Sequence, residues 1–232
     1  MTVDDLPRVI KERLIRDDIE SHEAHARTES LTRYSLSELN FCLRKSWFER
    51  TGEWQAKPLD ALFKMKMGSL LDQWWCAQFP RRQQRVTHTV EIKGDPEHPS
   101  VTVSGIFDVE DEDGAIADLK FMRTLEPTRD KGPGEYYVDQ VAFYCHCESR
   151  LEGRLHASSH GDFERVDMHF TAEDLRQRMA QIDERARALF CAVRDRCAPE
   201  GPRFRWECGG CGYRGLCDKI KADDATQAGG GA

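Results

Sequence analysis

The sequence predicts an α/β fold in which a central sheet is flanked by helices, and three observations support this. The chain has 232 residues, enough for one sizeable domain, and no linker-like stretch divides it. Strand-like runs lie between residues 85 and 121. Helical patterns, with apolar residues three or four positions apart, precede and follow these runs.

The first quarter of the chain is expected to be helical. Apolar residues every four or five positions predict a leading helix within residues 1–33, followed by a loose segment. Ser35 or Ser37 can cap the next helix, which is expected to continue to Gly52.

A third helix is expected over residues 59–79, where Pro58 opens it and Pro80 ends it. Three strand-like runs follow, and an acidic turn separates the last two, so we expect a three-stranded meander. The runs are residues 85–93, 101–109 and 115–121.

The second half of the chain also mixes helix and strand patterns. A loop rich in turn residues, 127–134, comes first, and Thr171 can cap a long amphipathic helix near the end. The tail, residues 222–232, has the composition of a disordered segment. A further helix is expected over residues 135–151, and two strands are expected over residues 155–160 and 165–170.

The charge balance restricts the kinds of partner. The formal net charge is −7, from 34 Lys and Arg residues against 41 Asp and Glu residues. We therefore do not expect a protein that coats DNA through its overall charge, although a local basic groove is compatible with this balance. Arg81, Arg82 and Arg85 form a short basic run that either contacts phosphates or is solvated, and we expect it to be solvated.

The chain is expected to be cytoplasmic. Its first residues lack the apolar stretch of a signal peptide, and no window approaches the roughly 18 apolar residues of a membrane span. Nine cysteines, an odd number, argue against a disulfide framework in a protein without a leader.

Three of the cysteines, Cys208, Cys211 and Cys217, crowd a glycine-rich segment near the C-terminus, which is typical of a metal-binding loop. Three thiolates require a fourth ligand, and we select Cys42. Four cysteines suit a [4Fe–4S] cluster. Two alternatives stay open, which are a metal-free loop and a zinc site completed by another side chain. The candidates for that zinc ligand are Cys191, Cys197 or a histidine.

A carboxylate–lysine group lies in the predicted meander. Asp118 and Lys120 are two residues apart in a strand, so their side chains leave the same face. Asp108 ends the neighbouring strand, and a short hairpin brings it beside Asp118. Two carboxylates can hold Mg²⁺ or Mn²⁺, and the lysine can orient a water or offset charge on a phosphate. The alternative is an exposed ion pair, although the apolar neighbours in the strand argue against it.

Two helices carry further candidates. Gln140 and Tyr144 are four apart and share a face of the helix over residues 135–151. Gly68 and Asp72 share a face in the same way, where the glycine permits close approach to the sheet and Asp72 is a possible third metal ligand. Taken alone, each pair is better explained by packing or solvation than by a functional site.

Together these motifs resemble the RecB-like branch of the PD-(D/E)XK nucleases, and most of all the iron–sulfur exonuclease family associated with CRISPR adaptation. The ordered set spans residues 34–218. Its members are Ser35 to Trp47 with Cys42 and Arg44, Gly68 to Asp72, G-x-x-D at Gly105 to Asp108, D-x-K at Asp118 to Lys120, Q-x-x-x-Y at Gln140 to Tyr144, and C-x-x-C-x-Y-x-x-x-C at Cys208 to Cys217.

The resemblance implies a PD-(D/E)XK core, a mixed sheet flanked by helices, in one domain over residues 34–221. It implies metal-dependent cleavage of DNA that is single-stranded or has single-stranded overhangs, with Asp108, Asp118, Lys120, Gln140 and Tyr144 at the catalytic site and Asp72, Asp108 and Asp118 on the metal. The four cysteines would hold an iron–sulfur cluster that joins the N- and C-terminal segments.

The role implied is CRISPR spacer acquisition, with the CRISPR integrase complex as a partner, or phage or cellular DNA recombination and repair. One departure from the family is that Asp72 stands where a metal-binding histidine is usual. That departure keeps a second hypothesis open, a DNA-binding or scaffolding subunit with a weak site. A third hypothesis is a zinc-binding adaptor.

Overall fold

The computed structural model describes residues 6–28, 30–53, 55–122, 124–159 and 164–220, with the backbone alone for residues 22–28. The predicted disordered tail, residues 222–232, lies outside the described residues. The helices are α1 (Arg8–Thr28), α2 (Leu36–Asn40), α3 (Leu43–Arg50), α4 (Leu59–Cys76), α5 (Glu126–Lys131), α6 (Glu135–Cys147) and α7 (Ala172–Arg194), with a 3₁₀ helix η2 (Arg205–Gly210). The strands are β1 (Arg33–Ser35), β2 (Arg82–Glu91), β3 (Ser100–Glu110), β4 (Ile116–Met122), β5 (Gly153–Ser159) and β6 (Arg165–Phe170).

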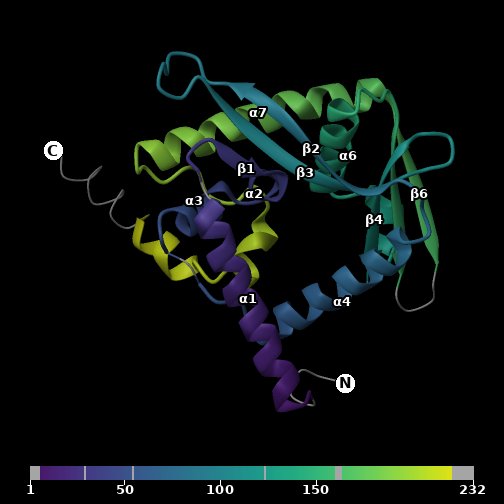
Figure 1. Ribbon diagram of the computed structural model, residues 1–232, viewed down its shortest axis with the longest axis horizontal. Coiled ribbons are helices and arrows are strands. Elements are labelled where there is room, and N and C mark those ends of the chain that lie inside the picture. Colours follow the sequence, from purple (N-terminus) through teal and green to yellow (C-terminus); the bar gives the residue numbers. More distant parts are fainter. Residues whose placement is uncertain (1–5, 29, 54, 123, 160–163, 221–232) are drawn as a thin grey trace.

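The strands form one mixed six-stranded sheet, as expected for the predicted fold class (Figure 1). The order is β1-β3-β4-β5-β6, and β2 pairs with β3. β2, β3 and β4 make the predicted antiparallel meander. β4 and β5 are parallel, and α6 makes the connection between them.

The helices cover both faces of the sheet. α6 and α7 pack on one face, where Phe107, Ile116 and Phe143 belong to the main core. α4 packs on the other face, where Cys76 contacts Ala117 and its neighbours in a second cluster. Because Ile116 and Ala117 are consecutive in β4, their assignment to different clusters follows from the alternation of side chains along a strand. α1 rests on α4 through a small apolar cluster of its own.

β3 has an uneven pattern of partners that positions the site. One edge of β3 pairs with β2 over almost its whole length. The other edge pairs with β1 at residues 102–104 and with β4 only at Val109 and Glu110. Residues 105–108 of that edge therefore lack a strand partner in this sheet.

The predicted helix from Ser35 or Ser37 to Gly52 is wrong in one respect, because the chain breaks into α2 and α3 at Phe41 and Cys42. Ser35 caps α2, as predicted, and Glu38 closes a capping box. The break is stabilised by distant side chains that bind the carbonyl groups at the end of α2. Ser46 Oγ donates to Glu38 O at 2.9 Å, Arg203 donates to Asn40 O at 3.3 Å, and Arg185 donates to Leu39 O and Phe41 O.

Three smaller differences also have local causes. The loop predicted at 127–134 contains the short helix α5, which ends before Gly132 with φ of 75°. The helix predicted to reach residue 151 ends at Cys147, and Ser149 has a positive φ of 54° that no α-helix accommodates. The three-residue strand β1 was not predicted, and it is held by backbone pairing to β3. Among the described helices, none combines the length and hydropathy that a bilayer span requires.

Candidate active site where strands β3 and β4 diverge

The candidate site begins where the β3–β4 ladder stops. The last paired residues are Val109 with Ala117, and Asp108 and Asp118 are the next residues along the two strands. Beyond that point the carboxylate of Asp108 accepts a hydrogen bond from the backbone N–H of Leu119 at 2.8 Å. The divergence of the strands thus places one carboxylate on each side of a small opening.

Asp118 and Lys120 lie on one face of β4, as the spacing predicts. Lys120 Nζ is 2.7 Å from Asp118 Oδ2 and 3.8 Å from Asp108 Oδ2. The side chain of Asp118 is 2% exposed and that of Lys120 is 22% exposed. Although Asp118 Oδ2 contacts this ammonium, no donor among the described residues is aligned for a hydrogen bond to it. The structure therefore brings these three residues together.

The three charges perturb one another. Burial raises the pKa of Asp118, and the nearby Asp108 adds to the increase while Lys120 opposes it. Burial disfavours the ammonium of Lys120, but Asp118 and Asp108 outweigh it, so the pKa of Lys120 is raised. A protonated lysine is consequently the stable form beside these carboxylates.

Asp72 joins this group from α4. Burial and the charge of Asp108 raise the pKa of Asp72 to about 6, and Lys120 partly offsets the increase. Three carboxylates and one ammonium thus share the site, which leaves an excess of negative charge when all are ionised. Gly68, one turn earlier on α4, has nothing within 4 Å of where a Cβ would lie, so the predicted close approach to the sheet at this glycine is wrong.

Helix α6 supplies the aromatic side of the site. Tyr144 packs against Gly105, where an added Cβ would lie 2.7 Å from Tyr144 Cε1. Burial and the charges of Asp118 and Asp108 raise the pKa of Tyr144 well above its ordinary value, so it is a neutral phenol. Gln140 is half-buried one turn before Tyr144 on the same helix.

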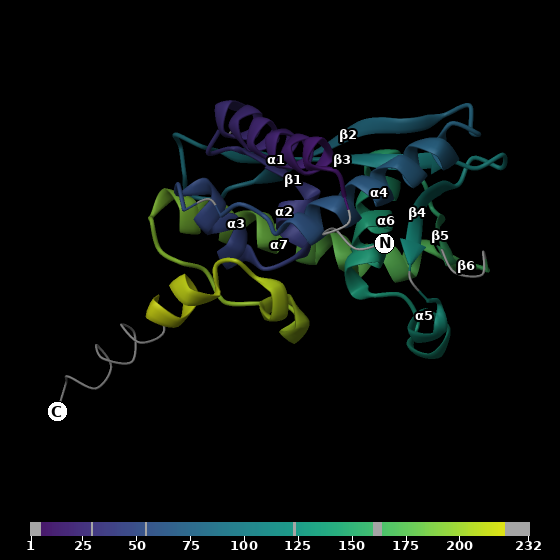
Figure 2. The same cartoon turned by 90° about the horizontal axis from the view of Figure 1, so that it is seen from below.

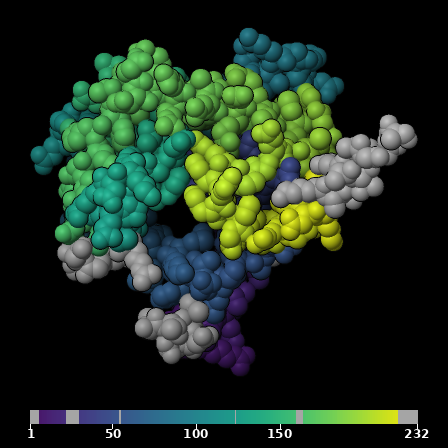
Figure 3. All heavy atoms as spheres, turned by 180° about the vertical axis from the view of Figure 1, so that it is seen from behind, coloured from purple at the N-terminus to yellow at the C-terminus, as the bar shows by residue number. Residues whose placement is uncertain are grey.

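Tyr137 is a site residue that the sequence reasoning missed. Its ring centroid is 5.6 Å from Lys120 Nζ, a cation–π distance. The available signal was its position, one turn before Gln140 on the same helix. Figure 3 shows the surface hollowed between the blue stretch around α4, the teal stretch around α5 and α6, and the yellow C-terminal segment.

The C-terminal segment lies against α2 and α3 (Figure 2), so the predicted proximity of the Cys42 region to the C-terminal cysteine segment is present. Glu207 accepts a hydrogen bond from the backbone N–H of Cys42 at 2.7 Å. The ring of Tyr213 stacks on Phe48 with centroids 5.3 Å apart. Burial raises the pKa of the Cys42 thiol, with smaller contributions from the charges of Glu207 and Cys217.

Among the described residues, the cysteine and carboxylate side chains do not form a complete metal-binding site. Within the described part of the chain, no group of three or more His, Cys, Asp or Glu side chains is placed to hold one metal ion. All nine cysteines are free thiols. The donor chemistry fits both predicted groups, since carboxylate oxygens suit Mg²⁺ or Mn²⁺ and four thiols suit an iron–sulfur cluster.

Comparison with solved structures identifies a related fold. The crystal structure of SSO0001 matches with a TM-score of 0.65 at 18% identity, over 90% of this chain and 95% of that chain. The two proteins share a fold. At this identity, the likeness says nothing about activity.

Two further structures are more distant. The first is a "putative exonuclease" from Eubacterium rectale, with a TM-score of 0.48 and 14% identity over 82% of this chain and 89% of that chain. The second is an alkaline exonuclease from Laribacter hongkongensis, with a TM-score of 0.43 and 12% identity over 80% of this chain and 94% of that chain. No protein-family model and no curated protein sequence matches the chain.

Proposed function

We propose that the protein is a metal-dependent DNA nuclease of the PD-(D/E)XK type, which acts as an exonuclease on DNA that is single-stranded or has single-stranded overhangs. Its proposed role is CRISPR spacer acquisition, or phage or cellular DNA recombination and repair. One observation carries the proposal, the convergence of Asp108, Asp118 and Lys120 where β3 and β4 diverge. The CRISPR integrase complex is the partner that the family resemblance suggests.

In this proposal Asp72, Asp108 and Asp118 hold Mg²⁺ or Mn²⁺. When bound, the ion supplies a polarised phosphate and a water of lowered pKa. Lys120 keeps its proton, because its carboxylate neighbours raise its pKa, and it donates to a phosphate oxygen or to the attacking water. The neutral phenol of Tyr144 and the amide of Gln140 orient the strand, and Tyr137 limits the space above Lys120.

The test is cleavage of end-labelled single-stranded DNA with Mn²⁺, Mg²⁺ or EDTA. We expect Lys120→Ala and Asp108→Ala each to reduce the cleavage rate at least about 10²- to 10³-fold, since each removes a group at the reacting phosphate. Lys93→Ala, which removes an exposed lysine from the β2–β3 turn, is the matched control and should cleave like the wild type. Unchanged cleavage by both site variants would sink the proposal.

The same assay addresses the scaffolding alternative, which Asp72 in place of a histidine favours. Wild-type protein that binds DNA but does not cleave it with either metal would support a binding or recruiting subunit. Gain of cleavage in Asp72→His would then identify Asp72 as the cause.

We further propose that Cys42, Cys208, Cys211 and Cys217 hold a [4Fe–4S] cluster. The contact of Glu207 with Cys42 and the effect of Cys217 on the Cys42 thiol support this grouping. Protein purified without oxygen should contain about four iron and four sulfide per chain. Cys42→Ser should lose this iron, whereas Cys191→Ser should keep it. Zinc without iron, lost in Cys191→Ser, would indicate the alternative zinc site.

A further inference from the structure

We propose that the cavity between β1, α2, β3 and α6 is a subsite for a phosphate of the DNA strand, next to the carboxylate–lysine site. This inference rests on the proposed nuclease function and adds the residues that bind the substrate beside the point of cleavage. The residues that would bind the phosphate are Arg33 and Arg85, with hydroxyl groups of the surrounding serines.

The cavity exists because of the uneven pairing of β3. It has a volume of about 620 Å³, within the range of roughly 300–1,000 Å³ typical of ligand sites. Ser104, Gly105 and Ile106 form its floor, where β1 has ended and β4 has not begun. Gln140 and Tyr144 line the cavity from α6, and Tyr144 also lies near Asp108 and Asp118 of the carboxylate–lysine site.

The charge of the cavity wall is positive. Three arginines and one carboxylate line it. Arg50 and Glu38 neutralise each other, with Nε and Oε1 2.5 Å apart and the side chains 4% and 9% exposed. Arg33 and Arg85 remain, and within the described residues neither guanidinium forms an ion pair.

The unpaired state of these two arginines is informative because acidic residues outnumber basic ones in this chain. Arg81, four residues before Arg85, pairs with Glu110 and Glu148. Arg85 instead makes one long contact, 3.5 Å from Nη1 to the hydroxyl of Ser104. In the basic run that was expected to be solvated, Arg81 is thus ion-paired, exposed Arg82 donates to the carbonyl groups of Ala77 and Phe79, and exposed Arg85 lines the cavity.

The remaining lining groups suit a sugar–phosphate strand. The hydroxyl groups of Ser35 and Ser37 lie 3.0 Å apart, and because Ser35 donates to Glu38 at 2.9 Å, Ser37 is the one that can donate to a phosphate oxygen. Ile106 is 44% exposed in the middle of β3, which offers an apolar contact to a sugar or base. Among the described residues, no carboxylate other than the neutralised Glu38 lines the cavity.

The position along β3 connects the subsite to the proposed chemistry. Arg85 pairs with Ile106, and Ile106 and Asp108 lie two residues apart on one face of β3, or about 7 Å at the rise of a strand. A DNA strand whose reacting phosphate lies at Asp108 can therefore reach Arg85 with a neighbouring phosphate.

The test is equilibrium binding of a fluorescent single-stranded oligonucleotide in EDTA, so that binding is measured without cleavage. We expect the double variant Arg33→Ala/Arg85→Ala to bind at least about tenfold more weakly, because hydrogen bonds to charged groups are among the stronger ones. The slope of log K against log salt should become shallower by about 1.4, since each phosphate contact to a single strand contributes about 0.7. Arg85→Lys, which keeps the charge, should retain most of the slope, and thermal melting checks that each variant is folded.

Lys93→Ala is the control, because it removes one exposed positive charge eight residues beyond Arg85. Oligonucleotides with a 5′-phosphate, a 3′-phosphate or no terminal phosphate separate two sources of the ligand. An equal loss for all three indicates an internal phosphate, and a loss confined to one terminal phosphate indicates an end-binding site.

Wild-type affinity and slope in the folded double variant would overturn the subsite, as would an equal loss in Lys93→Ala. If the double variant loses binding while Lys120→Ala still cleaves, the subsite stands and the proposed chemistry fails. Wild-type protein that binds none of the oligonucleotides would overturn both.

Discussion

Gly105 lies where the ring of Tyr144 passes closest to β3. A Cβ at this position would be 2.7 Å from Tyr144 Cε1 and 3.1 Å from Phe143 Cε1. Both rings belong to the main core, and Tyr144 also borders the candidate site. Glycine is therefore needed at this position of the G-x-x-D motif, because a larger side chain would prevent α6 from approaching the sheet beside Asp108.

Two glycine substitutions test this reason. Gly105→Ala should lower the free energy of unfolding by about 1–3 kcal/mol, the cost of overpacking a core, and should displace Tyr144. Gly68→Ala, in the interior of α4 with open space around it, should raise that free energy by about 0.5–1 kcal/mol, because alanine favours helix. Urea unfolding measures both, and a Gly105→Ala variant as stable as the wild type would contradict the steric argument.

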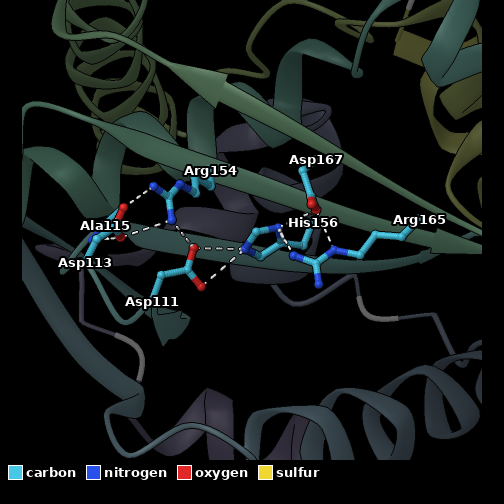
Figure 4. Close-up of polar contacts among 7 residues, drawn as sticks. All are labelled: Asp111, Asp113, Ala115, Arg154, His156, Arg165 and Asp167. Atoms are coloured by element: carbon cyan, nitrogen blue, oxygen red, sulfur yellow. Dashed lines mark hydrogen bonds and ion pairs between the residues drawn. The ribbon is translucent and has the colours of Figure 1, made fainter.

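At the scale of an element, the acidic turn between β3 and β4 is tied to β5 and β6 (Figure 4). Arg154 of β5 lies 2.7 Å from Asp111 and also pairs with Asp113. His156, which is 3% exposed, places Nε2 3.1 Å from Asp111 and Nδ1 2.7 Å from Asp167 of β6. The turn that carries the chain from Asp108 to Asp118 is thereby fixed to the sheet.

Replacing the buried histidine should loosen this turn. We expect His156→Ala to lower the free energy of unfolding by about 1–3 kcal/mol, because the partly buried hydrogen bonds of the imidazole with Asp111 and Asp167 are lost. His169→Ala, which removes an exposed histidine from β6, should change it by no more than about 0.5 kcal/mol. Denaturant unfolding distinguishes the two, and equal effects would show that the contacts of His156 contribute nothing.

At the scale of the whole molecule, the last part of the chain closes onto its first helices. Arg203 forms an ion pair with buried Asp139 of α6, and Arg44 donates to the carbonyl of Pro199 at 2.9 Å. Tyr213 is 3% exposed, and its hydroxyl accepts a hydrogen bond from the N–H of Gln55 at 3.1 Å. These contacts hold the cysteine segment beside Cys42.

Tyr213 gives a graded test of this closure. Tyr213→Phe removes one hydrogen bond and should cost about 0.5–1.5 kcal/mol, whereas Tyr213→Ala also removes the ring that packs on Phe48 and should cost about 3–5 kcal/mol. Iron content measured on the same variants should fall in Tyr213→Ala and stay unchanged in Tyr213→Phe if the cluster is present. Equal stability of the two variants would show that the stacked ring does not hold the segment.

The sequence by itself determined the elements whose cause is local. The meander and the long helices follow from apolar periodicity, the start of α2 follows from the Ser35 cap, and the shared face of Asp118 and Lys120 follows from the two-residue repeat of a strand. The structure contains these elements as predicted, because neighbouring residues are enough to specify them.

The tertiary structure alone decided the features that depend on residues far apart in the chain. The break between α2 and α3 is held by Arg185 and Arg203, more than 140 residues away, and β1 exists only through pairing with β3. The placement of Tyr137 over Lys120 and the unpaired state of Arg85 are likewise set by packing between elements. No local pattern encodes these contacts, since each depends on which distant side chain the fold brings within reach.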